Sequence, residues 1–157
     1  MVHLVRITNQ DYKYYRRSYA KIEYSFRLKD EPPMLISKEQ KQFTDAAILK
    51  KGEFLDELEK PGVEMYFVKD EQEEIVGIIT IYAEAKRAYI NMFAVFEKGK
   101  GIGTEAYNVL KEMFIERKIK LVRLLCPFNG ARVFWVKQGF YLVNRCDHKD
   151  ITYETWL

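Results

Sequence analysis

The spacing of hydrophobic and polar positions changes along the chain, from a helical period to the period of a β-strand. An alternating segment at residues 4–7 predicts a short first strand, and the polar-aromatic stretch after it predicts helices. These helices are expected at residues 12–26, from 37 toward 49 and, after a break at Lys51-Gly52, at 53–58. Pro61-Gly62 ends the helical part, because neither residue favours continuing a helix.

Strand-like segments follow, separated by short charged turns. They lie at residues 63–69, 75–82 and 88–95, and we expect them to pair as an antiparallel meander. Beyond a glycine-rich loop, a new helix is expected, because apolar residues share one helical face. These residues are Ala106, Val109, Leu110, Met113 and Phe114.

The last part of the chain predicts a strand at 119–125, a helix from Asn129 to Gln138, and a hairpin of strands at 140–145 and 151–156. Asn129 suits the N-cap of the helix, and Gly139 suits the left-handed residue after its end. Together the elements predict one α+β domain over residues 1–157. Its mixed, mostly antiparallel sheet would be flanked by helices.

Composition limits the possible functions. With 157 residues, 48% hydrophobic and 31% charged, the chain can bury one core. It has no run of about 18 apolar residues and no N-terminal secretion signal, so we expect a cytoplasmic protein without a membrane partner. A net charge of +3 is too small to predict nucleic-acid binding, but it suits a polyanionic cofactor. Cys126 and Cys146 lack CxxC spacing, so we expect no metal site and interpret both as buried structural thiols.

A glycine-rich loop from Lys98 to Thr104 joins the third meander strand to the amphipathic helix. Main-chain N–H groups and the helix dipole at such a position attract an anion, and glycine lets the backbone approach phosphate oxygens closely. Lys98 and Lys100 add positive charge. The loop therefore predicts a phosphate or pyrophosphate site; the simpler alternative is a turn with two solvated lysines.

Two common phosphate-binding motifs do not fit this loop. The Walker A motif needs four residues between its first glycine and Gly-Lys-Ser/Thr, and that spacing is absent. A dinucleotide fingerprint starting at Gly99 and Gly101 needs a glycine where Thr104 stands. A third pattern, Arg/Gln-x-x-Gly-x-Gly/Ala, holds pyrophosphate in coenzyme A-dependent acetyltransferases. It is similar to Lys98-x-x-Gly101-x-Gly103, with lysine at the first position.

A second motif lies after the next strand. The segment from Asn129 to Phe140 resembles the Asn-x-x-Ala-x-x-Phe/Leu-Tyr-x-x-x-Gly-Phe segment of the GNAT superfamily of N-acetyltransferases. Counted from Asn129, the matching residues Ala131, Phe134, Gly139 and Phe140 each stand one position early, and they keep the family's spacing among themselves. Together with the glycine loop, the resemblance covers roughly residues 63–157, and the two motifs stand in the family's order.

The resemblance implies an N-acetyltransferase that uses acetyl-coenzyme A (acetyl-CoA). In the implied fold, the strand before the glycine loop and the strand after the next helix splay apart, and the pantetheine arm pairs with exposed backbone. The implied pantetheine and thioester contacts are backbone groups at Phe93, Ala94 and Val95. The implied pyrophosphate contacts are Lys98, Gly99, Lys100, Gly101, Ile102, Gly103 and Thr104. Asn129 is implied to contact the cofactor from the other side, although helix capping alone is equally compatible with the sequence.

Trp135 stands where the family commonly has a tyrosine that protonates the leaving thiolate. An indole N–H donates a hydrogen bond but supplies no proton at neutral pH, so Trp135 keeps a place in the implied cofactor site without that role. The candidate base is Glu84, followed by Glu64, and the candidate acid is Tyr141. For each of them, a solvated charge or a packed aromatic is the simpler interpretation.

The expected acceptor is a primary amine of a small molecule or peptide, which attacks the thioester directly in a ternary complex. Aromatic residues between 12 and 43, with the acidic Glu23, Asp30 and Glu31, are candidates for its pocket, although core packing is favoured for the aromatics. An alternative function is a non-catalytic CoA-binding or regulatory module, and a more remote one is nucleotide binding. The C-terminal hairpin offers an edge for a homodimer.

Overall fold

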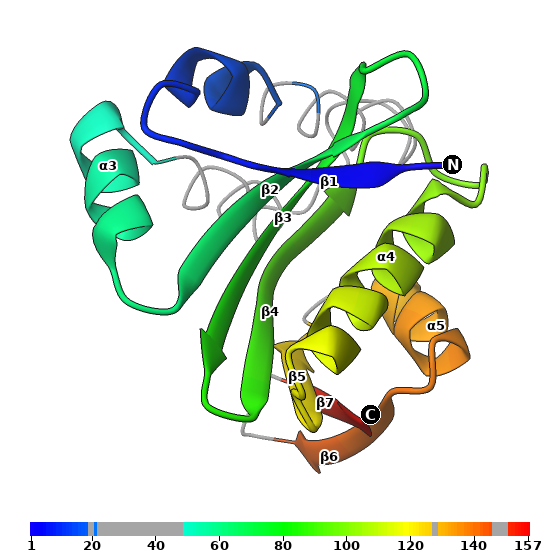
Figure 1. Cartoon of the computed structure of the whole chain (residues 1–157). Helices are drawn as coiled ribbons and strands as arrows, with labels where there is room; N and C mark the ends of the chain where they lie inside the picture. The colour runs from blue at the N-terminus through cyan, green and yellow to red at the C-terminus, as the bar shows by residue number, and fades with distance from the viewer. Residues whose placement is uncertain (19–20, 22–48, 127–128, 146–150) are drawn as a thin grey trace.

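A seven-stranded mixed sheet forms the centre of the molecule, and helices pack on both of its faces (Figure 1). The structure is a computed structural model that describes residues 1–18, 21, 49–126, 129–145 and 151–157. The strands are β1 (His3–Arg6), β2 (Val63–Lys69), β3 (Ile75–Glu84), β4 (Arg87–Val95), β5 (Leu121–Leu125), β6 (Tyr141–Arg145) and β7 (Ile151–Trp156). The labelled helices are α3 (Lys51–Glu59), α4 (Ile102–Glu116) and α5 (Asn129–Lys137). Residues 12–18 are also helical.

The strand order is β1-β2-β3-β4-β5-β7-β6. The expected meander is confirmed, because β2 pairs with β3 and β3 pairs with β4, each time antiparallel. Strands β4 and β5 are parallel, since helix α4 crosses over between them. The C-terminal hairpin is confirmed too, and β7 lies inside it against β5. The fold is therefore α+β with a mixed, mostly antiparallel sheet, as the sequence predicts.

The two faces of the sheet bury separate hydrophobic clusters, because neighbouring residues of a strand point to opposite faces. Ile79 of β3 belongs to the cluster beneath α4 and α5, together with Leu110 of α4. Ile78 belongs to the cluster on the other face, with Tyr15 and Phe54. Burying one such side chain contributes about 1.5–3 kcal/mol, so the clusters hold the helices firmly against the sheet.

Two local expectations need correction. Helix α3 begins at Lys51 and includes Gly52, so these residues open a helix instead of breaking one. Glycine is tolerated in this first turn, where N–H groups lack an intrahelical acceptor in any case. Asn129 is the first residue of α5 and not the residue before it. Gly139 is left-handed as expected, with φ +97°. The helix expected at residues 12–26 is described only up to residue 18 and at residue 21. The helix expected from 37 toward 49 lies almost entirely outside the described residues.

Candidate functional site

Strands β4 and β5 run side by side over only part of their length. Their parallel pairing ends at Ile90 and Leu124, after four residue pairs. Strand β4 continues to Val95 and stays paired with β3. On the side of β5, the main chain of residues 91–95 therefore has no strand partner within the described part of the chain. This loss of pairing agrees with the divergence of the two strands that the family resemblance implies.

A β-bulge at Asn91 accounts for this divergence. Ile81 of β3 pairs with Ile90, whereas the preceding Thr80 pairs with Met92, so Asn91 is an extra residue in β4. A bulge bends its strand and increases the local twist. We attribute the separation of the end of β4 from β5 to this bend.

The glycines of the loop after β4 serve different purposes. Gly99 (φ +81°) and Gly101 (φ +77°) adopt the left-handed conformation, which costs other residues roughly 1–2 kcal/mol. A Cβ at either position would meet no atom within 4 Å, so the requirement is conformational. At Gly103 the requirement is space, because a Cβ would lie 3.3 Å from the ring of Phe134.

Helix α4 starts directly after this loop and presents a free N-terminus. Gly101 is its N-cap, and no side chain among the described residues caps the helix. The N–H groups of residues 102–104 consequently lack an intrahelical acceptor, and they carry the positive end of the helix dipole. Lys98 and Lys100 are exposed beside it, and Lys100 forms an ion pair with Glu97 at 2.6 Å. This end of α4 is suited to hold a phosphate.

Aromatic rings fill the space between the diverging end of β4 and the two helices that follow it. The ring centroid of Phe93 of β4 lies 5.8 Å from that of Phe134 and 5.0 Å from that of Trp135, both on α5. Trp135 also meets Tyr107 of α4 edge-on at 5.6 Å. Trp135 is 6% exposed and Tyr107 is 1% exposed. Trp135 is thus a core residue on the helix-covered side of the divergence.

Glu84 and Tyr141, the predicted base and acid, lie away from the open part of β4. Glu84 ends β3, pairs with Arg87 and accepts a hydrogen bond from the Tyr82 hydroxyl at 3.0 Å. From Arg87 to Val95, β4 spans about 26 Å at about 3.3 Å per residue. Tyr141 begins β6, the outermost strand, which β5 and β7 separate from β4. Their catalytic roles stay predictions.

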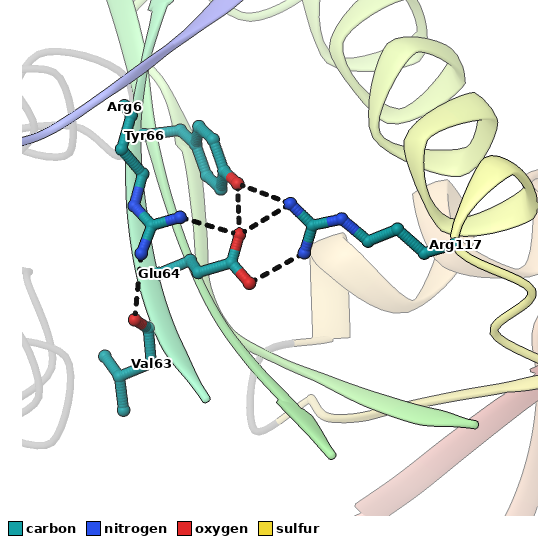
Figure 2. Close-up of polar contacts among 5 residues, drawn as sticks. All are labelled: Arg6, Val63, Glu64, Tyr66 and Arg117. Atoms are coloured by element: carbon teal, nitrogen blue, oxygen red, sulfur yellow. Dashed lines mark hydrogen bonds and ion pairs between the residues drawn. The ribbon is translucent and has the colours of Figure 1, made fainter. Parts of the chain in front are cut away.

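Glu64, the second candidate base, is held in an ionic cluster (Figure 2). Its carboxylate accepts hydrogen bonds from Arg117 at 2.7 and 2.9 Å and from the Tyr66 hydroxyl, and Arg6 lies 3.0 Å away. Burial alone would raise the pKa of Glu64, but the hydrogen bonds from Arg117 and Tyr66 and the positive charges of Arg117 and Arg6 lower it. The carboxylate is already occupied by donors and ties β2 to the C-terminal end of α4.

The remaining predicted residues are only partly described. The main chain of Asn129 starts α5, but its side chain lies outside the description, so its contact with a cofactor stays a prediction. Cys126 is buried, as expected, and Cys146 lies outside the described residues. The acidic acceptor candidates Glu23, Asp30 and Glu31 lie there too. Tyr12 and Tyr15 pack on Phe54, which supports the core interpretation of these aromatics.

Sequence reasoning missed two features. One is the bulge at Asn91, although the helix-facing apolar positions Ala88, Ile90 and Phe93 shift from even to odd numbers there. The other is Arg132, whose Nε–H is buried without a hydrogen-bond partner in the described part of the molecule. Arg132 lies one turn of α5 before Trp135.

Comparisons with known proteins agree with this geometry. The model of the acetyltransferase (GNAT) family matches residues 14–140, which is most of the chain. The chain belongs to this family, and it is an N-acetyltransferase that depends on acetyl-CoA. No curated protein matches it by sequence.

Solved structures show the same fold at low sequence identity. The PaiA N-acetyltransferase of Thermoplasma acidophilum, in complex with coenzyme A, has a TM-score of 0.77 at 14% identity, over 100% of this chain and 99% of that one. An acetyltransferase of Thermus thermophilus has a TM-score of 0.71 at 16% identity, over 100% and 97%. The ribosomal-protein-S18-alanine N-acetyltransferase of Escherichia coli has a TM-score of 0.68 at 10% identity, over 99% and 94%.

The described residues fit acetyl-CoA in length and charge. An extended pantetheine arm is about 15 Å long, which is close to the length of the five residues 91–95 in a strand. The N-terminus of α4 lies just beyond the end of that strand, where the pyrophosphate would fall. Among the described residues, no group of His, Cys, Asp or Glu could hold a metal ion. In the same part of the chain, no helix is long and apolar enough to cross a membrane.

Proposed function

We propose that the protein transfers the acetyl group to a primary amine of a small molecule or peptide, by direct attack of the amine in a ternary complex. The observation that carries this proposal is that residues 91–95 have no strand partner on the side of β5 among the described residues, beside the N-terminus of α4. This arrangement can hold both reactants in one place, and proximity of that kind removes several kcal/mol from a reaction barrier.

The main chain of β4 has two tasks in this proposal. The N–H and C=O groups in the segment Phe93, Ala94 and Val95 that face away from β3 align the pantetheine arm as an added strand would be aligned. An N–H group that points toward the gap also stabilises the negative charge that develops on the thioester oxygen. Acetyl-CoA supplies the activated carbonyl, so the protein's contribution is binding, orientation and charge stabilisation.

The loop and α4 fix the other end of the cofactor. The N–H groups of Ile102, Gly103 and Thr104 face the pyrophosphate, with Lys98 and Lys100 beside it, while Gly99 and Gly101 let the backbone take the required shape. Arg132 is a further candidate for an anion contact, because its buried Nε–H lacks a partner among the described residues. Such a cation is normally paired when it is buried.

Proton transfer is assigned to water. The amine must lose one proton, and the leaving thiolate must gain one. Trp135 cannot supply the proton that the thiolate gains. Glu84 lies beside Arg87, at the opposite end of β4 from residues 91–95, and Tyr141 lies on β6, which β5 and β7 separate from β4. Neither is therefore placed to contact the thioester directly. A chain of water molecules along the open strand edge is the route that the described residues favour, and an amine already neutral when bound needs no side-chain base.

Calorimetric titration with coenzyme A tests the site. We expect Gly101→Ala to weaken binding about tenfold, because its left-handed conformation becomes costly by roughly 1–2 kcal/mol. Gly52→Ala is the matched control, since a Cβ there meets nothing within 4 Å and φ is not positive. Absence of coenzyme A binding by the wild-type protein, or equal binding by Gly101→Ala, would contradict the proposed site.

Thiol release from acetyl-CoA tests the acceptor class. Incubation with a panel of small primary amines and of peptides with free amino groups should give amine-dependent release. Replacing each amine by its N-methylated quaternary analogue should abolish release, because that nitrogen has no lone pair. Tight coenzyme A binding with no release across the panel would instead favour the binding or regulatory module.

We further propose that the protein forms a homodimer through β6. This strand is at the edge of the sheet, and its Tyr141, Leu142 and Val143 are 45%, 44% and 46% exposed. An exposed apolar edge strand readily pairs with a second copy. Light scattering after gel filtration should give the dimer mass, and Leu142→Glu should give the monomer mass. A wild-type monomer at high concentration would contradict this proposal.

A further inference from the structure

Three aromatic rings form a line from the open part of β4 into the core. Phe93 projects from the centre of the unpaired segment 91–95 and meets Trp135 edge-on at 5.0 Å. On its other side, Trp135 meets Tyr107 edge-on at 5.6 Å and 90°. The ring of Phe140 contacts both inner rings, with its centroid 5.1 Å from that of Trp135 and 5.6 Å from that of Tyr107. The helix-covered side of the divergence is therefore filled with rings.

The rings of this line have little freedom to move aside. Tyr107 is 1%, Phe140 2% and Trp135 6% exposed. The Tyr107 hydroxyl has no hydrogen-bond partner among the described residues. The Tyr107 ring contacts both Trp135 and Phe140, and close packing of this kind leaves it little room to move away from Trp135.

The acyl end of the cofactor would fall beside this line. If pyrophosphate lies at the N-terminus of α4, an arm of about 15 Å that follows β4 back from Val95 reaches Asn91, next to Ile90, the last residue of β4 that pairs with β5. The paired strands block further extension in the plane of the sheet. On the helix-covered side, an acyl chain would meet the ring of Trp135 beside Phe93.

We infer that Trp135 is the residue that restricts the acyl donor to the acetyl group. This inference rests on the proposed position of the cofactor. The indole occupies the space into which a propionyl, butyryl or hexanoyl chain would extend, and Tyr107 behind it prevents retreat. Steric exclusion at such a wall lowers the affinity for the acyl donor about tenfold or more for each added methylene. Trp135 is therefore a specificity residue, and replaces the proton donor common in the family.

Calorimetric binding of coenzyme A and of acetyl-, butyryl- and hexanoyl-CoA provides the test. In the wild-type protein, affinity should fall at least tenfold from acetyl- to butyryl-CoA. In Trp135→Ala, butyryl-CoA should bind at least as well as acetyl-CoA, because a chain can enter the vacated volume. Val136→Ala is the matched control, since Val136 is the next residue of α5 and is 56% exposed.

The outcomes separate the inference from the proposed site. Loss of unacylated coenzyme A binding in the wild-type protein would reject the site itself. Normal coenzyme A binding with the same acyl-chain profile in wild type and Trp135→Ala would reject the role of Trp135. If Trp135→Ala does not fold, as judged by circular dichroism, Trp135→Leu replaces it, and Phe93→Ala opens the same wall from β4. An unchanged profile in these folded variants would likewise reject the wall. Turnover with each donor should follow the binding profile.

Discussion

The two ends of helix α4 are built in opposite ways. At its N-terminus, the chain turns through left-handed Gly99 and Gly101 and leaves the first N–H groups without a side-chain cap. At its C-terminus, Arg117 reaches Glu64 of β2 with two hydrogen bonds, at 2.7 and 2.9 Å, and Tyr66 completes the cluster (Figure 2). At the N-terminus the first N–H groups lack side-chain partners among the described residues, whereas at the C-terminus the polar side chains are hydrogen-bonded to one another.

This difference indicates a division of labour along one helix. An open N-terminus binds a phosphate well only if it is held in a fixed position, because mobile donors lose binding energy to ordering. The ionic cluster at the far end, together with Leu110 and Phe114 in the core, holds that position. We therefore expect changes at the Glu64 end to act on stability and changes at the glycine end to act on cofactor binding.

Replacing Glu64 should have the largest effect on stability. Glu64→Ala leaves Arg117 and Arg6 close together without their carboxylate, and breaking a buried ion pair costs about 3–5 kcal/mol. We expect about 2–3 kcal/mol, because the two arginine side chains are 39% and 49% exposed and keep part of their hydration. Urea unfolding measures the loss, and Glu112→Ala, an exposed position on α4, is the control.

The Glu64→Ala variant also tests whether the two ends of α4 act independently. At a temperature where Glu64→Ala is fully folded, its affinity for coenzyme A should stay within about twofold of the wild type, a difference well below 1 kcal/mol. A tenfold weaker affinity in the folded variant would show that the two ends are coupled. The division of labour would then be wrong.

Acid should weaken the Glu64 end selectively. Because the pKa of Glu64 is lower in the folded protein than the ordinary value of 4.5, the unfolded chain binds its proton first as the pH falls. Its stabilising contribution is complete above the unfolded pKa and is lost as the pH falls through the folded pKa. The stability difference between wild type and Glu64→Gln should therefore shrink from about pH 5 downward. Urea midpoints between pH 7 and pH 3 measure it, and a constant difference would contradict the assignment.

The sequence predicts the open end of α4 better than the tied end. Glycine spacing and the apolar face that starts at Ala106 are local signals, so the loop, the helix and the adjacent strands can be read from neighbouring residues. Glu64 and Arg117 are 53 residues apart, and nothing local distinguishes them from solvated charges. Trp135 was readable as a departure from the family's tyrosine, but its contact with Phe93 and Tyr107 depends on how three elements pack.

A smaller effect is expected from Gly103→Ala. A Cβ would lie 3.3 and 3.4 Å from two carbons of the Phe134 ring, so the ring must shift slightly against Phe93. Overpacking of this kind costs about 1–3 kcal/mol, whereas alanine gains up to about 1 kcal/mol of helix propensity. We expect a net loss of about 1 kcal/mol, measured as a lower thermal midpoint, with weaker coenzyme A binding. A gain in stability would show that the Phe134 ring moves freely.

The smallest change concerns the wall at the open end. Tyr107→Phe removes a hydroxyl that is buried without a partner in the described structure, while the ring that backs Trp135 remains. Burial also raises the pKa of Tyr107, so the hydroxyl stays neutral at any physiological pH. Since an unmet buried hydroxyl costs about 1 kcal/mol or more, we expect Tyr107→Phe to be neutral or to stabilise the protein by up to about 1 kcal/mol. Urea unfolding measures this change, and the preference for acetyl- over butyryl-CoA should be unaltered. A loss of about 1 kcal/mol or more in the free energy of unfolding would mean that the Tyr107 hydroxyl does have a hydrogen-bond partner. The packing behind Trp135 would then include a polar contact and would not consist of aromatic rings alone.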